Sequence, residues 1–302
     1  MPSKTKQLAE NALMLGIALV LLFLSTYTVL GALAGILVPL PFLVLGLSRT
    51  IPNMVWISLA FTFLGWIMTG PITAFAALEF AVWGAMMGIF YTRKGTAISG
   101  ITAGAAAVFL GFVLMLAFMI FGMQTSFDSI LQQASLLRPS FVPKEQYDQY
   151  IELGKMLLPA SMVMFSFGSS AIVHWLARLV GKRLRRPVPA LKPIREWTFP
   201  RSLLYYYFIA MIVMLVFGAS IQGTFWESAI LNVKVMLDAI FALQGLSFCL
   251  FAANLYGWKR LTFPLVVCLF IFPFLTTILS LVGIFDLGIR LRKKLETRVK
   301  RG

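Results

Sequence analysis

Long apolar segments separated by short basic stretches constrain the fold of this chain more than any other feature. Of its 26 Lys and Arg residues, 22 fall in six short stretches, and membrane-length apolar segments run between them. A bilayer core of about 30 Å requires about 20 apolar residues per helix. Loops rich in Lys and Arg resist translocation, so these stretches predict which ends face the cytoplasm. They are Lys4–Lys6, Arg49, Arg93–Lys94, 178–201, Lys259–Arg260 and 290–301.

The composition supports a membrane protein of the helical class. The chain is 60% hydrophobic and only 12% charged, which is more apolar surface than a soluble domain buries. The apolar runs are continuous and not alternating, so we predict helices and not a barrel. The expected fold is an all-α polytopic transmembrane bundle with about eight or nine hydrophobic segments, placed in the plasma membrane. The net charge of +15 is then a topology signal, and no nucleic-acid partner is expected.

Breaks in the pattern predict the domain organisation. Residues 1–177 form a six-segment, transporter-like unit with an outer loop at 123–155, and residues 202–289 form a C-terminal membrane unit. A basic linker at 178–201, a basic tail at 290–302 and the N-terminus are expected in the cytoplasm. The last helix before Trp258 is predicted over 238–257. Pro264 and Pro273 then predict a bent hairpin or re-entrant pair within 262–289, which keeps the tail in the cytoplasm.

Glu79 is the strongest candidate for a functional side chain. It stands eight residues after Pro71, which is near mid-membrane at 1.5 Å per residue. A carboxylate there costs about 3 kcal/mol on insertion scales, so it must be protonated, paired or facing a polar cavity. It is a ligand or proton site, or a neutral acid hydrogen-bonded between helices. We predict a substrate site that also includes the break at Pro39 and Pro41, together with Gln244 and Asn254 on a later helix.

Two charged pairs and several small residues are assigned structural roles. Lys234 with Asp238, and Asp286 with Arg290, stand four apart and predict ion pairs at helix ends. Small residues at helical spacing let helices approach closely, within one bundle or against a partner membrane protein. These residues are Ala77, Ala81, Ala85, Gly84 and Gly88 on one segment, and Ala12 and Gly16 on the first.

The sequence argues against an enzyme. It has no GxxxxGK[ST] phosphate loop, no HExxH and a single histidine, His174, so no ATPase, metal centre or cofactor is expected. Gly168-Ser169-Ser170 resembles the nucleophile motif of intramembrane serine proteases. However, His174 lies on the same helix, where nucleophile and base do not normally meet, so we interpret it as an interfacial histidine.

The order of these features resembles the YybS-like family of multi-pass membrane proteins. Pro39-Leu40-Pro41, Gly70-Pro71 and Gly84–Gly88 before Arg93-Lys94 are similar to its N-terminal half. Asn232, Gln244-Gly245, Phe272-Pro273 and Gly283-Ile284-Phe285-Asp286 are similar to its C-terminal half. The first six segments are also similar in pattern to the substrate-binding subunits of energy-coupling-factor transporters. That likeness implies docking to an energising subunit through an Ala-x-x-x-Ala pattern, here Ala12 with Gly16 in place of the second alanine.

Two hypotheses of function follow. The first is a small-solute-binding or transport component without its own ATPase, with 123–155 as a lid and with energy from a partner or an ion gradient. The second is a membrane scaffold that assembles partner membrane proteins and transports nothing. A polar cavity at Glu79 favours the first, and a dry, fully packed bundle favours the second.

Overall fold

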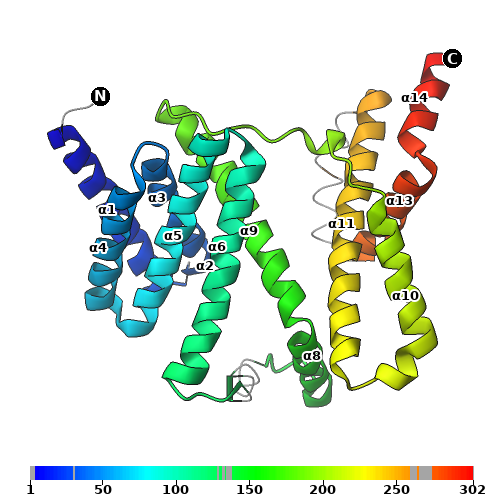
Figure 1. Cartoon of the computed structure of the whole chain (residues 1–302), viewed down its shortest axis with the longest axis horizontal. Helices are drawn as coiled ribbons and strands as arrows, with labels where there is room; N and C mark the ends of the chain where they lie inside the picture. The colour runs from blue at the N-terminus through cyan, green and yellow to red at the C-terminus, as the bar shows by residue number, and fades with distance from the viewer. Residues whose placement is uncertain are drawn as a thin grey trace. The chain divides into compact units, whose positions relative to one another are not determined.

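The computed structural model of the chain describes residues 4–29, 31–127, 129–130, 133, 138–258, 264 and 274–301 (Figure 1). These residues form helices and short connections, without a strand among them. Seven of the described helices are long and apolar enough to cross a membrane, and the bent pair Phe274–Ile289 and Leu291–Thr297 gives an eighth if counted as one span. The prediction of an all-helical polytopic bundle is confirmed.

The chain divides into two compact units. The first comprises residues 1–147 and 161–191, and the second comprises residues 148–160 and 192–302. The division falls inside the basic stretch 178–201. Residues 148–160, which the sequence analysis placed in the N-terminal unit, belong to the second unit because Ser228 and Asn232 both hydrogen-bond to the Met156 carbonyl. Each unit is described by itself.

Local sequence signals set the helix ends in the first unit. Gly70, in the left-handed region at φ 89°, reverses the chain, and Pro71 at once opens the next helix, where its missing N–H costs nothing. Thr96 caps the helix that follows, because its Oγ1 accepts a hydrogen bond from the Ser99 N–H. The elements are α1 (Lys4–Tyr27), α2 (Gly31–Leu37), α3 (Pro39–Gly46), α4 (Ile51–Thr69), α5 (Pro71–Lys94), α6 (Ala97–Ala117), the π-helical turn η1 (Phe118–Gly122) and α9 (Leu158–Arg183).

Helix α5 is the centre of the first unit. It contributes to a core shared with α1, α3 and α4, and to a second core shared with α3, α6 and α9. The eight residues of α3 are all buried, although this helix is too short to cross a bilayer. Irregular backbone persists at membrane depth only where protein or a water-filled cavity covers it. The break between α2 and α3 is covered in this way, by packing on α5.

A shared carboxylate joins three basic stretches at one end of this unit. Glu10 of α1 accepts a 2.9 Å contact from Arg49, which follows α3, and a 2.6 Å contact from Arg186, which follows α9. The Arg49 side chain is only 3% exposed. Arg49 and Arg186 therefore meet beside the N-terminal end of α1, which also carries Lys4 and Lys6, and the placement of this end in the cytoplasm stays a prediction.

The second unit is built around α11, the longest helix. Its described elements are most of α8 (Lys144–Met156), the 3-10 turn η2 (Ile194–Glu196), α10 (Ser202–Ile221), α11 (Phe225–Leu255), α13 (Phe274–Ile289) and α14 (Leu291–Arg301). Helices α11 and α13 cross in direct backbone contact, because a Cβ at Gly245 would clash with the Leu279 carbonyl and one at Gly283 with the Phe241 carbonyl. These two glycines set the closest approach in the unit.

Two predictions about the C-terminal segments change. The helix predicted over 238–257 begins thirteen residues earlier, at Phe225, so the predicted start was wrong. A bent hairpin or re-entrant pair was predicted within 262–289 from Pro264 and Pro273. Pro273, where the bend was expected, lies outside the described residues. A bend of 72° does occur further on, between α13 and α14, where Arg290 adopts a φ of 54°.

Candidate functional site

Glu79 lies on the face of α5 that packs against α6. Its carboxylate occupies the space over Gly111, where an added Cβ would come within 2.9 Å of Glu79 Oε1. Glycine at position 111 therefore makes room for the acid between the two helices. Glu79 is eight residues, or about 12 Å, beyond the start of α5 and fifteen residues, or about 22 Å, before its end. The side chain is half-buried at this depth.

No hydrogen bond or ion pair joins Glu79 to another residue in the described part of the chain. Three other acids on membrane-length or apolar helices contrast with it. Glu10 contacts two arginines, Asp238 contacts Lys234 at 2.7 Å, and Asp286 contacts Arg292 at 3.0 Å. An unpaired carboxylate within a span must take up a proton or a cationic ligand to be tolerated. The geometry thus leaves Glu79 with one unmet interaction.

Two buried polar pairs continue from Glu79 along α5 toward its C-terminal end. Trp83, one turn after Glu79, donates its indole N–H to Ser170 Oγ at 3.0 Å, and Tyr91 is hydrogen-bonded to His174 Nδ1 at 2.7 Å. Glycines on α6 make room for this row as Gly111 does for Glu79, since a Cβ at Gly100 would meet the Tyr91 ring. The row lies in the interface of α5, α6 and α9.

His174 differs from its predicted place and role. It is 2% exposed, not interfacial, and its Nε2 atom is buried without a hydrogen-bond partner among the described residues. Ser170 and His174 bond to different partners on α5 and not to each other. Ser170 and His174 therefore make no nucleophile–base contact with each other.

The small residues of α5 pack inside the unit. A Cβ at Gly84 would clash with the Pro39 carbonyl, and one at Gly88 would clash with the Leu43 carbonyl. Ala77, Ala81 and Ala85 are buried in the core that α5 shares with α1, α3 and α4. This face of α5 is covered by its own chain. Ala12 and Gly16 on α1 differ: both are exposed, and a Cβ at Gly16 would meet nothing within 4 Å.

The predicted substrate-binding residues are distributed over both units. Pro39 and Pro41 are buried in α3, which packs over Gly84, about 140° around α5 from Glu79. Gln244 and Asn254 belong to the second unit. Helix α5 thus presents different faces to α3 and α6, and a substrate site shared by the proline break and Glu79 stays a prediction.

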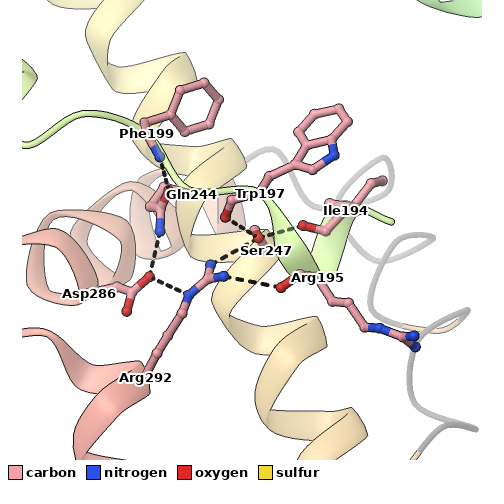
Figure 2. Close-up of polar contacts among 8 residues, drawn as sticks. All are labelled: Ile194, Arg195, Trp197, Phe199, Gln244, Ser247, Asp286 and Arg292. Carbon is pink, nitrogen blue, oxygen red and sulfur yellow. Dashed lines mark hydrogen bonds and ion pairs between the residues drawn. The ribbon is translucent and has the colours of Figure 1, made fainter. Parts of the chain in front are cut away.

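Gln244 belongs to a fully bonded polar cluster (Figure 2). Its Oε1 accepts from the Phe199 N–H at 3.0 Å, and its Nε2 donates to Asp286 Oδ2 at 2.5 Å. Arg292 donates to the same carboxylate oxygen at 3.0 Å, to Ser247 Oγ at 2.9 Å and to the Arg195 carbonyl at 3.1 Å. These bonds fix the chain around residues 194–199 onto α11 and α13.

Arg292, not Arg290, is the partner of Asp286. The predicted spacing of four holds only within a continuous helix, and α13 ends at Ile289. The left-handed conformation at Arg290 turns the chain and brings Arg292 back over the Phe251 ring, with its Cζ 5.5 Å from the ring centre. Spacing in the sequence offered little reason to pair Asp286 with Arg292, because residues six apart do not face each other on one helix.

Asn254 and the Lys234–Asp238 pair also have local partners. Asn254 Oδ1 accepts from Arg195 Nη1 at 3.2 Å near the end of α11. Lys234 Nζ and Asp238 Oδ2 are 2.7 Å apart, and Ser280 Oγ of α13 reaches Asp238 Oδ1 at 3.5 Å. Because α11 begins at Phe225, the pair lies in the interior of this helix and not at its outer end.

Sequence comparisons place the chain in a family. Residues 15–287 match the family described as "Predicted membrane protein (DUF2232)". The chain belongs to this family. It is also 27% identical over 314 residues to a protein of Bacillus subtilis (strain 168) named "Uncharacterized protein YybS", and the match covers 97% of this chain and 99% of that protein. No solved structure matches the chain. The resemblance to YybS-like proteins is thus confirmed.

Proposed function

We propose that this DUF2232 protein is a small-solute-binding or transport component of the membrane, and that Glu79 is its ligand- or proton-binding carboxylate. One observation carries the proposal: Glu79 lies inside a membrane-length helix, over Gly111, without a partner among the described residues. Intramembrane acids of this kind usually mark ion or substrate pathways. A purely structural acid would have the kind of partner that Asp238 and Asp286 have.

The chemistry of this site favours a proton or a small cation over a bulky anionic solute. Glu79 supplies negative charge, and α6 supplies no Lys, Arg or His beside it. Phe75, one turn before Glu79 on α5, is stacked on Phe118 of η1 with ring centres 6.0 Å apart. Rings and a carboxylate together suit a cationic group. Energy would come from an ion gradient or from a partner, because the sequence has no phosphate loop.

The decisive variant is Glu79→Gln, which keeps the size and removes the charge. The full-length protein is reconstituted in liposomes, and currents on a solid-supported membrane are recorded with proton, sodium, potassium and tetramethylammonium gradients, then with vitamins, divalent metals and nucleobases. We expect a current or uptake signal in the wild type that Glu79→Gln abolishes and Glu145→Gln retains, since Glu145 is exposed on α8. If Glu79→Gln matches the wild type in every condition, the proposal fails.

A scaffold role is the second candidate, and the α1 surface favours it. Ala12 and Gly16 form an open small-residue face, as docking of a partner helix would require. The likeness to energy-coupling-factor subunits that the sequence pattern predicts, and that stays a prediction, would use the same two positions. Gly16→Leu should then prevent co-purification of a stoichiometric partner in mild detergent. Gly218→Leu is the matched control, because a Cβ there also meets nothing within 4 Å. A monomer that co-purifies nothing counts against this role.

A further inference from the structure

A shallow hollow with polar and apolar walls lies between the N-terminal ends of α1 and α4. Its volume is about 240 Å³, and its polar lining consists of Lys4, Gln7 and Asn11 from α1 with Asn53 and Trp56 from α4. The apolar run of α1 starts just after Asn11, so the hollow lies where this helix leaves the lipid for water. Indole rings are enriched at that level of the bilayer. Trp56 is 72% exposed there.

The lining is rich in hydrogen-bond donors and contains no acid. Arg49 Nε donates to Asn11 Oδ1 at 2.9 Å, and Arg has no acceptor, so the Asn11 NH₂ group is left as a donor. Within the described residues, that NH₂ group has no acceptor, and neither do the Lys4 ammonium, the Asn53 amide and the Trp56 indole N–H. Four hydrogen-bond donors thus surround one space.

The nearby carboxylate does not compete for this space. Both oxygens of Glu10 are held by Arg49 and Arg186, at 2.9 and 2.6 Å. Lys4, Lys6, Arg49 and Arg186 together carry four positive charges against the one of Glu10, which leaves the region at +3. A cationic surface with free N–H donors favours an anion with several acceptor oxygens.

We propose that this hollow binds the phosphate of an anionic phospholipid headgroup. A phosphodiester offers acceptor oxygens to Lys4, Asn11 and Asn53, and the position at the end of α1 lets the acyl chains follow the exposed apolar side chains of this helix, such as Leu8 and Leu13. The same donors suit a free phosphate. The two sources share one chemistry and are separated by experiment. This inference is independent of the role of Glu79.

Native mass spectrometry of the full-length protein tests the inference. Dioleoylphosphatidylglycerol, dioleoylphosphatidylcholine or inorganic phosphate is titrated into protein in micelles, and the fraction carrying a first bound lipid is measured. We expect phosphatidylglycerol to bind more tightly than phosphatidylcholine. Lys4→Gln should weaken phosphatidylglycerol about fivefold, and Asn53→Leu about tenfold. Lys294→Gln, which removes one exposed charge from α14, should leave it unchanged.

Each result decides one way. Loss of the phosphatidylglycerol preference in the two hollow variants, with the control intact, supports a lipid site. Displacement of the first phosphatidylglycerol by millimolar inorganic phosphate supports the site with a soluble phosphate as its ligand. Equal binding of wild type and hollow variants, or an equal loss in Lys294→Gln, overturns the inference. Lys4 and Asn53 are exposed, so a normal gel-filtration profile of both variants is expected and is checked first.

Discussion

Asp286→Asn tests whether the cluster of Figure 2 holds the second unit together. The substitution keeps the shape and removes the charge that Arg292 faces, with the Asp286 and Arg292 side chains only 3% and 15% exposed. Breaking a buried ion pair on one side costs about 3–5 kcal/mol, because the remaining charge is left uncompensated. Arg292 keeps its bonds to Ser247 and the Arg195 carbonyl, which offset part of that cost. We expect a loss of about 2–3 kcal/mol.

Cys249 provides a readout for this unit. It is half-buried on α11, so a thiol-reactive fluorescent dye reports the thermal unfolding of the second unit. A loss of this size lowers the midpoint by about 10 °C, from the scaling for soluble domains of similar length. Glu196→Gln is the control, because the Arg195–Glu196 pair is about half exposed at 4.0 Å and should contribute little.

A double-mutant cycle separates pairing from polarity. Asp286→Asn combined with Arg292→Met should be less destabilised than the sum of the two single variants, with a coupling of at least about 1 kcal/mol. The reasoning is refuted if the effects add, or if Asp286→Asn unfolds within 1–2 °C of Glu196→Gln. Either result would mean that the Gln244 amide and the backbone contacts hold the segment around 194–199 without help from charge.

Two further predictions concern packing and the buried histidine. Gly283→Ala should destabilise the second unit by about 1–3 kcal/mol in the same dye assay, because its Cβ would clash with the Phe241 carbonyl. The control Gly218→Ala should be neutral, because a Cβ there meets nothing within 4 Å. Equal unfolding midpoints of the two variants would contradict the close crossing of α11 and α13. Tyr91→Phe should destabilise the first unit by about 1–3 kcal/mol, because His174 loses its partner. Intrinsic tryptophan fluorescence on heating measures this, with exposed Tyr205→Phe as the control, and an unchanged midpoint would mean that the bond contributes nothing.

The order of the helices could be predicted because it depends on local properties of the sequence, namely the length of each apolar run and the prolines and glycines at its ends. Local signals such as Gly70-Pro71 and Gly95 mark both ends of α5 directly in the sequence. The start of α11 was missed for the opposite reason. Lys234 and Asp238 lower the apparent hydrophobicity of its first half, but they neutralise each other in space. The polar side chain of Asn232 is likewise satisfied, because it accepts a hydrogen bond from the Ala160 N–H and donates one to the Met156 carbonyl.

The sites depend on contacts between segments, which the sequence pattern does not contain. The choice of Arg292 over Arg290 requires a left-handed residue that ends α13, and no turn residue such as glycine announces it. The separation of Glu79 from Pro39 depends on which face of α5 each neighbour takes. Depth alone identified Glu79 as costly, but the glycine that makes room for it lies on another helix, 32 positions away.

The acids of the described residues differ in charge compensation, and this difference supports the proposed role of Glu79. Where the described structure needs an acid to join segments, it supplies a cation from a distant element: Arg49 and Arg186 for Glu10, and Arg292 for Asp286. At Glu79 the facing element, α6, supplies a glycine instead. A residue that only needed burial would be better served by an apolar side chain at this position, since an acid adds a desolvation cost of several kcal/mol and here gains no bond in return. Glu79→Leu should therefore stabilise the first unit on heating while abolishing any Glu79-dependent current, and a variant less stable than the wild type would show that the acid has a structural partner after all.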